Sequence, residues 1–199
     1  MPDSTAWSIA RRAPEATITP EPHHLYNDFM IIDPGNLFLD VIIRHIHLAG
    51  KSVLEVGYGD GRLSSQLSCH TGRLTAVGPE GVALDKARGR LSGITFALAS
   101  GESLAFAAHC FDAVVFTLSL HHQNSIAALR EATRVVHPDG IILMVEPCQD
   151  GEVELLCNVF NDETEVLNQA MQAVSSSGLS PGQHEILTPQ WKCADGMRS

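Results

Sequence analysis

The sequence is poor in positive charge. Its 199 residues hold 13 lysines and arginines against 23 aspartates and glutamates, a formal net charge of −10. Proteins that hold nucleic acid through its phosphates rely on clustered lysine and arginine. The only adjacent basic pair here is Arg11 with Arg12. The composition therefore predicts that the chain does not bind nucleic acid.

Long apolar runs are also missing. No run approaches the roughly 18 residues that a membrane helix needs. Pro2 and Asp3 stand where a signal peptide would carry positive charge followed by an apolar core. These two absences predict a cytoplasmic protein that does not enter the membrane.

The cysteines do not form a recognisable framework. Five is an odd number, and none of them has CxxC spacing, so neither a disulfide scaffold nor a structural zinc site is expected. The ten histidines include two adjacent pairs but no HExxH motif. We therefore predict reduced thiols and no metal site.

Periodicity divides the chain into an arm and one domain. Residues 1–33 contain four prolines and little periodicity, which predicts an N-terminal arm. The remainder, 34–199, is predicted to be a single domain. Its first helix is expected to begin with Asp33 as N-cap and Pro34 in the first turn, and to end at Gly50.

Short apolar runs and helical stretches then alternate. Strands are expected over 52–56, 74–77, 94–98, 113–118 and 141–146, with a last edge strand over 185–187. Helices are expected over 61–68, 82–91, 125–136 and 164–177, and a turn over 137–140. This order predicts an α/β fold: a Rossmann-like three-layer sandwich whose mostly parallel sheet has helices on both faces.

One motif directly follows the first strand. An acid and three glycines stand at alternate positions: Glu55, Gly57, Gly59 and Gly61. Glycines at the carboxyl end of a strand let the backbone approach a ligand. A dinucleotide site would need GxGxxG, but Arg62 stands at the third glycine, and Asp60 near the helix N-terminus would repel pyrophosphate. GxxxxGK does not occur, so a phosphate-bearing cofactor is disfavoured.

The stretch VLEVGYGDGRLSSQL resembles motif I of the class I S-adenosylmethionine-dependent methyltransferases. FDAVVFTLSLHH and LREATRVVHPDGIILMVEP are similar to segments of the small-molecule subgroup that includes the quinone-biosynthesis C-methyltransferases, and the resemblance covers roughly residues 36–148. It implies S-adenosyl-L-methionine as cofactor and a small-molecule methyl acceptor. That cofactor has a sulfonium, an ammonium and a carboxylate but no phosphate, so acids beside the loop are electrostatically suitable.

The resemblance also implies cofactor-binding residues. They are Glu55, Gly57, Tyr58, Gly59, Gly61, Glu80, Ser100, Gly101, Glu102 and Leu118. Two positions depart from the family pattern. Gly78 stands where an acid at the end of the second strand binds the ribose, so that Glu80 either replaces this acid or is merely solvated. Ser100 stands where an Asp near the adenine amine is usual.

His121 and His122 follow the fourth strand and are the predicted catalytic residues. One of them would orient the substrate or take its proton, because imidazole titrates near neutral pH; alternatively, the pair only ends the strand and packs on the next helix. Leu118-Ser119-Leu120-His121 stands where DNA amino-methylating members have an NPPY-like turn, which favours a small metabolite. In the family, arms such as 1–33 often cover the pocket, so this arm is either a lid or a loosely packed terminus.

Two further functions remain open at this stage. The departures at Gly78 and Ser100 are also compatible with a non-catalytic or atypical S-adenosylmethionine-binding homologue that acts as a partner protein. An enzyme that uses the cofactor for another reaction is the third reading. The chain is expected to be a monomer or a homodimer.

Overall fold

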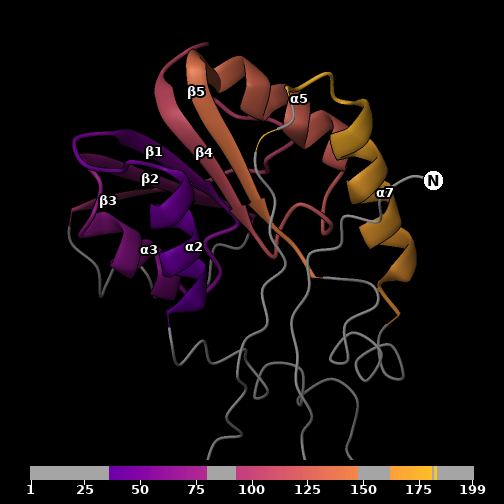
Figure 1. Ribbon diagram of the computed structural model, residues 1–199, viewed down its shortest axis with the longest axis horizontal. Helices are drawn as coiled ribbons and strands as arrows, with labels where there is room; N and C mark the ends of the chain where they lie inside the picture. The colour runs from indigo at the N-terminus through magenta and orange to yellow at the C-terminus, as the bar shows by residue number, and fades with distance from the viewer. Residues whose placement is uncertain (1–35, 80–92, 148–161, 181, 183–199) are drawn as a thin grey trace, which may run out of the picture. The chain divides into compact units, whose positions relative to one another are not determined.

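The computed structural model describes residues 36–79, 93–147, 162–180 and 182. The predicted arm, the helix over 82–91, the edge strand over 185–187 and Glu80 lie outside these residues. In chain order the elements are α2 (Leu37–His45), β1 (Ser52–Val56), α3 (Arg62–Ser68), β2 (Arg73–Gly78), β3 (Ile94–Leu98), β4 (Phe111–Thr117), α5 (Ser125–Val135), β5 (Val136–Val145) and α7 (Thr164–Ser176) (Figure 1).

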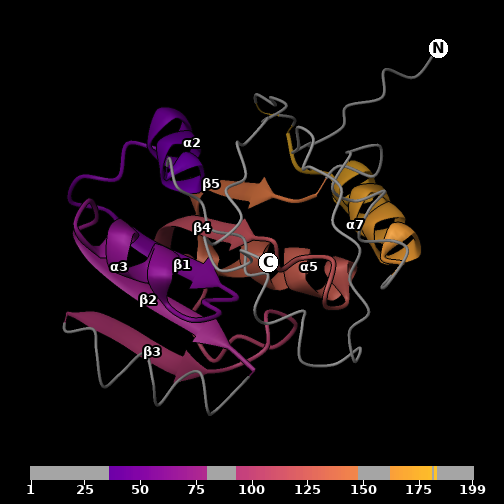
Figure 2. The same cartoon turned by 90° about the horizontal axis from the view of Figure 1, so that it is seen from below.

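The strands form one parallel sheet in the order β3-β2-β1-β4-β5, and Figure 2 shows them side by side in this order. The α/β prediction is thereby confirmed. From β1 the chain builds outward through β2 and β3, then returns to add β4 and β5 on the other side of β1. A crevice outside the carboxyl ends of β1 and β4 is the usual ligand position in such a sheet.

Successive side chains of a strand point to opposite faces of the sheet, so that buried strands need helices on both faces. Leu54 of β1 belongs to a buried apolar cluster with Ala128 of α5 and Ala170 of α7. Glu55 points to the opposite face, where Ser64 of α3 adjoins it. The sheet, α3, α5 and most of α7 belong to one compact unit, Phe38–Glu146 with Glu165–Gln183 (Figures 1 and 2). Within the described ranges, no helix is long and apolar enough to cross a membrane.

Two predicted boundaries are wrong. The turn expected over 137–140 lies inside β5, because pairing jumps from Phe111↔Val136 to Ala113↔Ile141 and the intervening residues bulge from the ladder. The first described helix runs from Leu37 to His45 and therefore ends before the predicted Gly50, whereas its predicted start at Asp33 and Pro34 lies outside the described residues.

Candidate functional site

The carboxyl ends of β1 and β4 are joined directly. The Ser119 hydroxyl, just beyond β4, donates a 2.6 Å hydrogen bond to the carbonyl of Val56, the last residue of β1. Gly57 follows with a φ of 90°, and a Cβ built on it would collide with Ser119. Only glycine satisfies both the backbone angle and the close approach at this position.

The glycine loop uses several of its amides internally. Gly57 and Tyr58 both donate to the carbonyl of Val77, over 2.7 and 3.3 Å, and Gly61 donates to the carbonyl of Tyr58 over 2.8 Å. Gly61 also has a left-handed φ of 80° and precedes α3 as its N-cap. These bonds give the loop a fixed shape and tie it to β2.

Gly59 is the open position of this loop. Its φ is 52°, and a Cβ built on it meets no described atom within 4 Å. A neighbouring acid, Asp60, accepts a 3.0 Å hydrogen bond from the Arg62 amide at the start of α3. Unlike Gly57, Gly59 therefore has the space into which a ligand can approach the backbone.

Glu55 is buried, with 1% of its surface exposed. Burial raises its pKa to about 7. The nearby Ser64 hydroxyl lowers this pKa, and the negative charge of Asp60 raises it. Neither Glu55 Oε2 nor Ser64 Oγ has a hydrogen bond of normal geometry. A buried, unsatisfied carboxyl oxygen is costly, and a ligand cation would compensate it.

Tyr58 packs at the end of β2 rather than projecting outward. Its ring is buried and meets Phe96 of β3 edge to face, with ring centroids 5.4 Å apart. A Cβ built on Gly78 would lie 2.8 Å from Tyr58 Cε1. The ring therefore covers Gly78, the residue that stands in the position of the family's ribose-binding acid.

The predicted residues after β3 are held by the chain itself. Ser100 Oγ accepts from the Glu102 amide over 3.2 Å, and the Glu102 carboxylate accepts from the Asn124 amide over 2.7 Å. Gly101 is buried against Gln123 and Val56, whose Cγ1 would lie 2.8 Å from an added Cβ. These contacts bring Ser100, Gly101 and Glu102 to the same sheet edge as the glycine loop.

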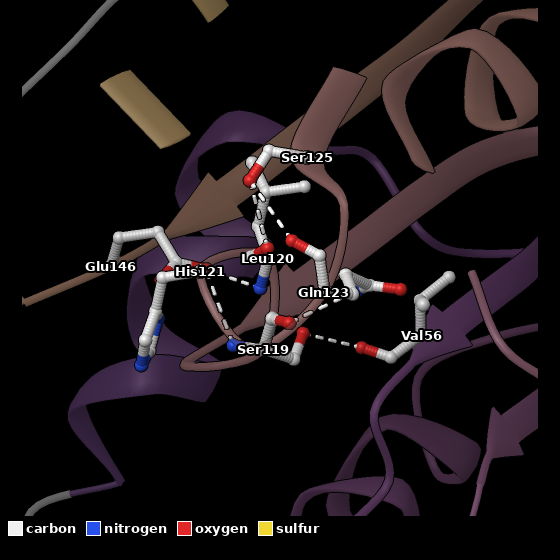
Figure 3. A network of polar contacts seen from close by, with 7 residues as sticks. All are labelled: Val56, Ser119, Leu120, His121, Gln123, Ser125 and Glu146. Atoms are coloured by element: carbon white, nitrogen blue, oxygen red, sulfur yellow. Dashed lines mark hydrogen bonds and ion pairs between the residues drawn. The ribbon is translucent and has the colours of Figure 1, made fainter. Parts of the chain in front are cut away.

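A buried carboxylate organises the loop after β4. Glu146, next to the end of β5, accepts through Oε1 from the Ser119 and Leu120 amides over 3.2 and 2.8 Å. Its Oε2 pairs with His121 Nδ1 (Figure 3). Glu146 is 6% exposed and His121 4%. Among the residues in Figure 3, this carboxylate is the one that links the loop to β5.

His121 and His122 have different surroundings. Their ring centroids are 3.9 Å apart, but His122 is exposed and His121 is buried beside Glu146. A carboxylate can only accept a hydrogen bond, so it favours the tautomer in which Nδ1 carries the proton and Nε2 is the basic nitrogen. The predicted Leu118 lies at the base of this loop with a φ of 51°, and its amide donates to Val145 over 2.8 Å.

Sequence reasoning did not join Glu146 to His121. Glu146 stands at the end of the predicted fifth strand and His121 after the fourth, 25 residues apart in the sequence. In a parallel sheet, the carboxyl ends of adjacent strands lie at one edge. This rule predicts that Glu146 and His121 lie close together. The Ser119 bond to Val56 had no signal in the sequence.

Comparison with known proteins identifies the domain. A family model described as a methyltransferase domain matches residues 54–144. The chain is 31% identical over 114 residues to phthiotriol/phenolphthiotriol dimycocerosates methyltransferase 1 of Mycobacterium ulcerans, covering 55% of this chain and 42% of that protein. It is 27% identical over 135 residues to the ubiquinone/menaquinone biosynthesis C-methyltransferase of Coxiella burnetii, covering 62% and 54%. The chain thus spans about half the length of these relatives.

Solved structures agree on the fold. A protein of an antibiotic biosynthesis pathway of Anabaena variabilis has a TM-score of 0.57 at 20% identity, covering 74% of this chain and 64% of that one. The [4+2]-cyclase SpnF has a TM-score of 0.55 at 19% identity, covering 72% and 57%. At this level of identity the likeness concerns the architecture alone.

Proposed function

Because this chain belongs to the class I S-adenosylmethionine-dependent methyltransferases, we propose that it transfers a methyl group from S-adenosyl-L-methionine to a small-molecule acceptor. The observation that carries the proposal is the open backbone at Gly59 next to the buried, unsatisfied carboxyl of Glu55. This pairing suits a cationic ligand and offers nothing for a phosphate.

The methionyl part of the cofactor fits these residues. We propose that Glu55 compensates the positive charge of the ligand and that the backbone from Gly57 to Gly61 forms the wall against which it lies. Gly101, which follows β3, and Leu118, which follows β4, complete the set of backbone groups at this edge. When bound, the cofactor supplies an electrophilic methyl group on sulfur.

The chain's own task is positioning and proton management. Glu146 fixes the His121 ring through Nδ1 and fixes the loop that carries it through two amides. Nε2 is then the nitrogen that takes a proton from an acceptor hydroxyl, amine or activated carbon. Holding two reactants in a near-attack arrangement supplies about 7 to 11 kcal/mol of a barrier, so geometry is the larger contribution.

A small acceptor is supported by the names of the relatives. The Coxiella burnetii protein acts in quinone biosynthesis, and the Mycobacterium ulcerans protein is a dimycocerosate methyltransferase. The net charge of −10 argues against a nucleic-acid acceptor. Ser100 and Glu102 remain proposed contributors at the nucleoside end, and Glu80 lies outside the described residues.

The test is calorimetric titration with S-adenosylhomocysteine. Gly59→Leu fills the open space and should abolish binding while the protein stays folded. Gly50→Leu is the matched control, because Gly50 has a φ of 74°, meets no described atom within 4 Å of an added Cβ, and precedes β1 at the other end of the strand. Absence of heat with the parent protein at millimolar ligand, or equal binding by Gly59→Leu, contradicts the proposal.

A further inference from the structure

The end of β2 carries an aromatic ring where a nucleoside-binding sheet usually carries an acid. In Rossmann-type βαβ units, an Asp or Glu about 20 residues after the first glycine hydrogen-bonds the ribose. Gly78 stands 21 positions after Gly57 and has no side chain. Tyr58, from the loop after β1, covers it instead.

Tyr58 and Gly78 depend on each other. The three atoms nearest to a Cβ built on Gly78 all belong to the Tyr58 ring, at 2.8, 3.1 and 3.2 Å. The ring cannot shift easily, because it packs on Phe96 and Ala76 and is 4% exposed. A carboxylate at position 78 is therefore excluded while Tyr58 is present.

The surroundings of the pair are apolar. Leu98, which pairs with Gly78 in the β2–β3 register, is 60% exposed. The Gly78 carbonyl already accepts a 3.1 Å hydrogen bond from the Ala99 amide. Among the described residues, the end of β2 therefore presents an aromatic ring and methyl groups to a ligand, and no carboxylate.

We infer that Tyr58 is a specificity-determining residue, which makes this crevice nearly indifferent to the sugar hydroxyls of its adenosyl ligand. The inference rests on the proposed function. Losing a charge-assisted hydrogen bond to a sugar hydroxyl removes the main reason for an enzyme to prefer the ribose form over a deoxy form. The protein therefore binds ligands that are modified at the sugar, and it recognises the adenosyl ligand by its base and its methionyl part.

The test compares S-adenosylhomocysteine with its 2′-deoxy analogue by calorimetry on the full chain. We expect dissociation constants within about threefold of each other, a difference smaller than one charge-assisted hydrogen bond. The double variant Tyr58→Ser/Gly78→Asp recreates a carboxylate in an open space. It should prefer the ribose form by roughly tenfold or more.

A stability cycle tests the coupling without any ligand. Gly78→Ala should lower the Tm in the parent and lower it less in a Tyr58→Ala background, since the collision partner is then gone. Equal effects of Gly78→Ala in both backgrounds would overturn the coupling, even if the double variant above failed to fold.

The outcomes separate the two proposals. A parent that binds S-adenosylhomocysteine but prefers it tenfold over the deoxy form overturns this inference alone, and loss of that preference in Glu80→Gln would then assign the sugar contact to Glu80. A parent that binds neither ligand overturns the proposed function and this inference together.

Discussion

Glu55 shows how one residue can oppose folding in order to serve a site. Its pKa is raised to about 7 in the folded chain, because burial disfavours the charged form. The folded state therefore holds the proton more tightly than the unfolded state between about pH 4.5 and 7. Stability contributed by this group is lost as the pH rises through that window.

We predict that Glu55→Gln removes this pH dependence. The raised pKa corresponds to a penalty of at most roughly 3 kcal/mol above pH 7, so the variant should gain stability relative to the parent between pH 5 and pH 8. Urea unfolding at both pH values measures the difference. Asp139→Asn, at an exposed acid of β5 that does not act on Glu55, is the control. If the free energy of unfolding of Glu55→Gln depends on pH in the same way as that of the parent, the assignment is contradicted.

His121 and His122 are adjacent in sequence but not equivalent. Only His121 is held by the buried carboxylate of Glu146. We predict that His121→Asn lowers turnover about a hundredfold or more with any acceptor that supports the reaction. The affinity for S-adenosylhomocysteine should stay within about threefold of the parent value, because this side chain is proposed to act on the acceptor. His122→Asn is the matched comparison and should have a smaller effect on turnover.

A spectroscopic measurement can show whether Glu146 positions the His121 ring or only contributes to folding. Long-range ¹H–¹⁵N spectra should show a proton on His121 Nδ1 in the parent and a mixture of tautomers in Glu146→Gln, because the amide no longer selects one form. A single unchanged tautomer in Glu146→Gln would refute the positioning role.

At the scale of elements, α5 fixes the segment that follows β3. Arg134 donates 2.7 Å hydrogen bonds to the carbonyls of Leu104 and Phe106. Glu131, one turn earlier, pairs with Arg134 and accepts from the Leu104 amide over 2.9 Å. This tie holds the chain just after Ser100–Glu102, so that a helix far in sequence supports the candidate site.

We predict that this tie makes the protein sensitive to acid. Hydrogen bonds from Arg134 lower the pKa of Glu131 to about 2, so the stability it contributes is present above about pH 4.5 and is lost as the pH falls toward 2. In Glu131→Gln, the free energy of unfolding should depend less on pH in this range than it does in the parent. Arg130→Gln, at an exposed position of the same helix, should leave the curve unchanged; identical curves for parent and Glu131→Gln would disprove the role.

At the scale of the whole molecule, a ligand at the sheet edge should stabilise the entire compact unit. The candidate site consists of the segments that follow β1, β3 and β4, which unfold with the sheet. We predict that S-adenosylhomocysteine at a hundred times its dissociation constant raises the free energy of unfolding by about 2.7 kcal/mol. Thermal unfolding with increasing ligand measures this rise, and Gly59→Leu should show none.

The sheet itself was largely predictable from the sequence. Ser52–Val56 and Ile94–Leu98 are strands with the predicted boundaries, because apolar β-branched runs between turn residues form buried parallel strands. The turn predicted over 137–140 was wrong, since ladder pairing with β4 extends β5 across those residues. That pairing depends on a partner strand about 25 residues away, which local propensity does not register.

The sequence by itself determined the α/β architecture, the glycine loop after β1 and the methyltransferase resemblance, because strand periodicity and glycine spacing are local properties. Only the tertiary structure decided that Glu146 holds His121 and that Tyr58 covers Gly78. Both contacts join residues from different strand ends. Their geometry follows from sheet order and side-chain packing, which exist only when the whole sheet has assembled.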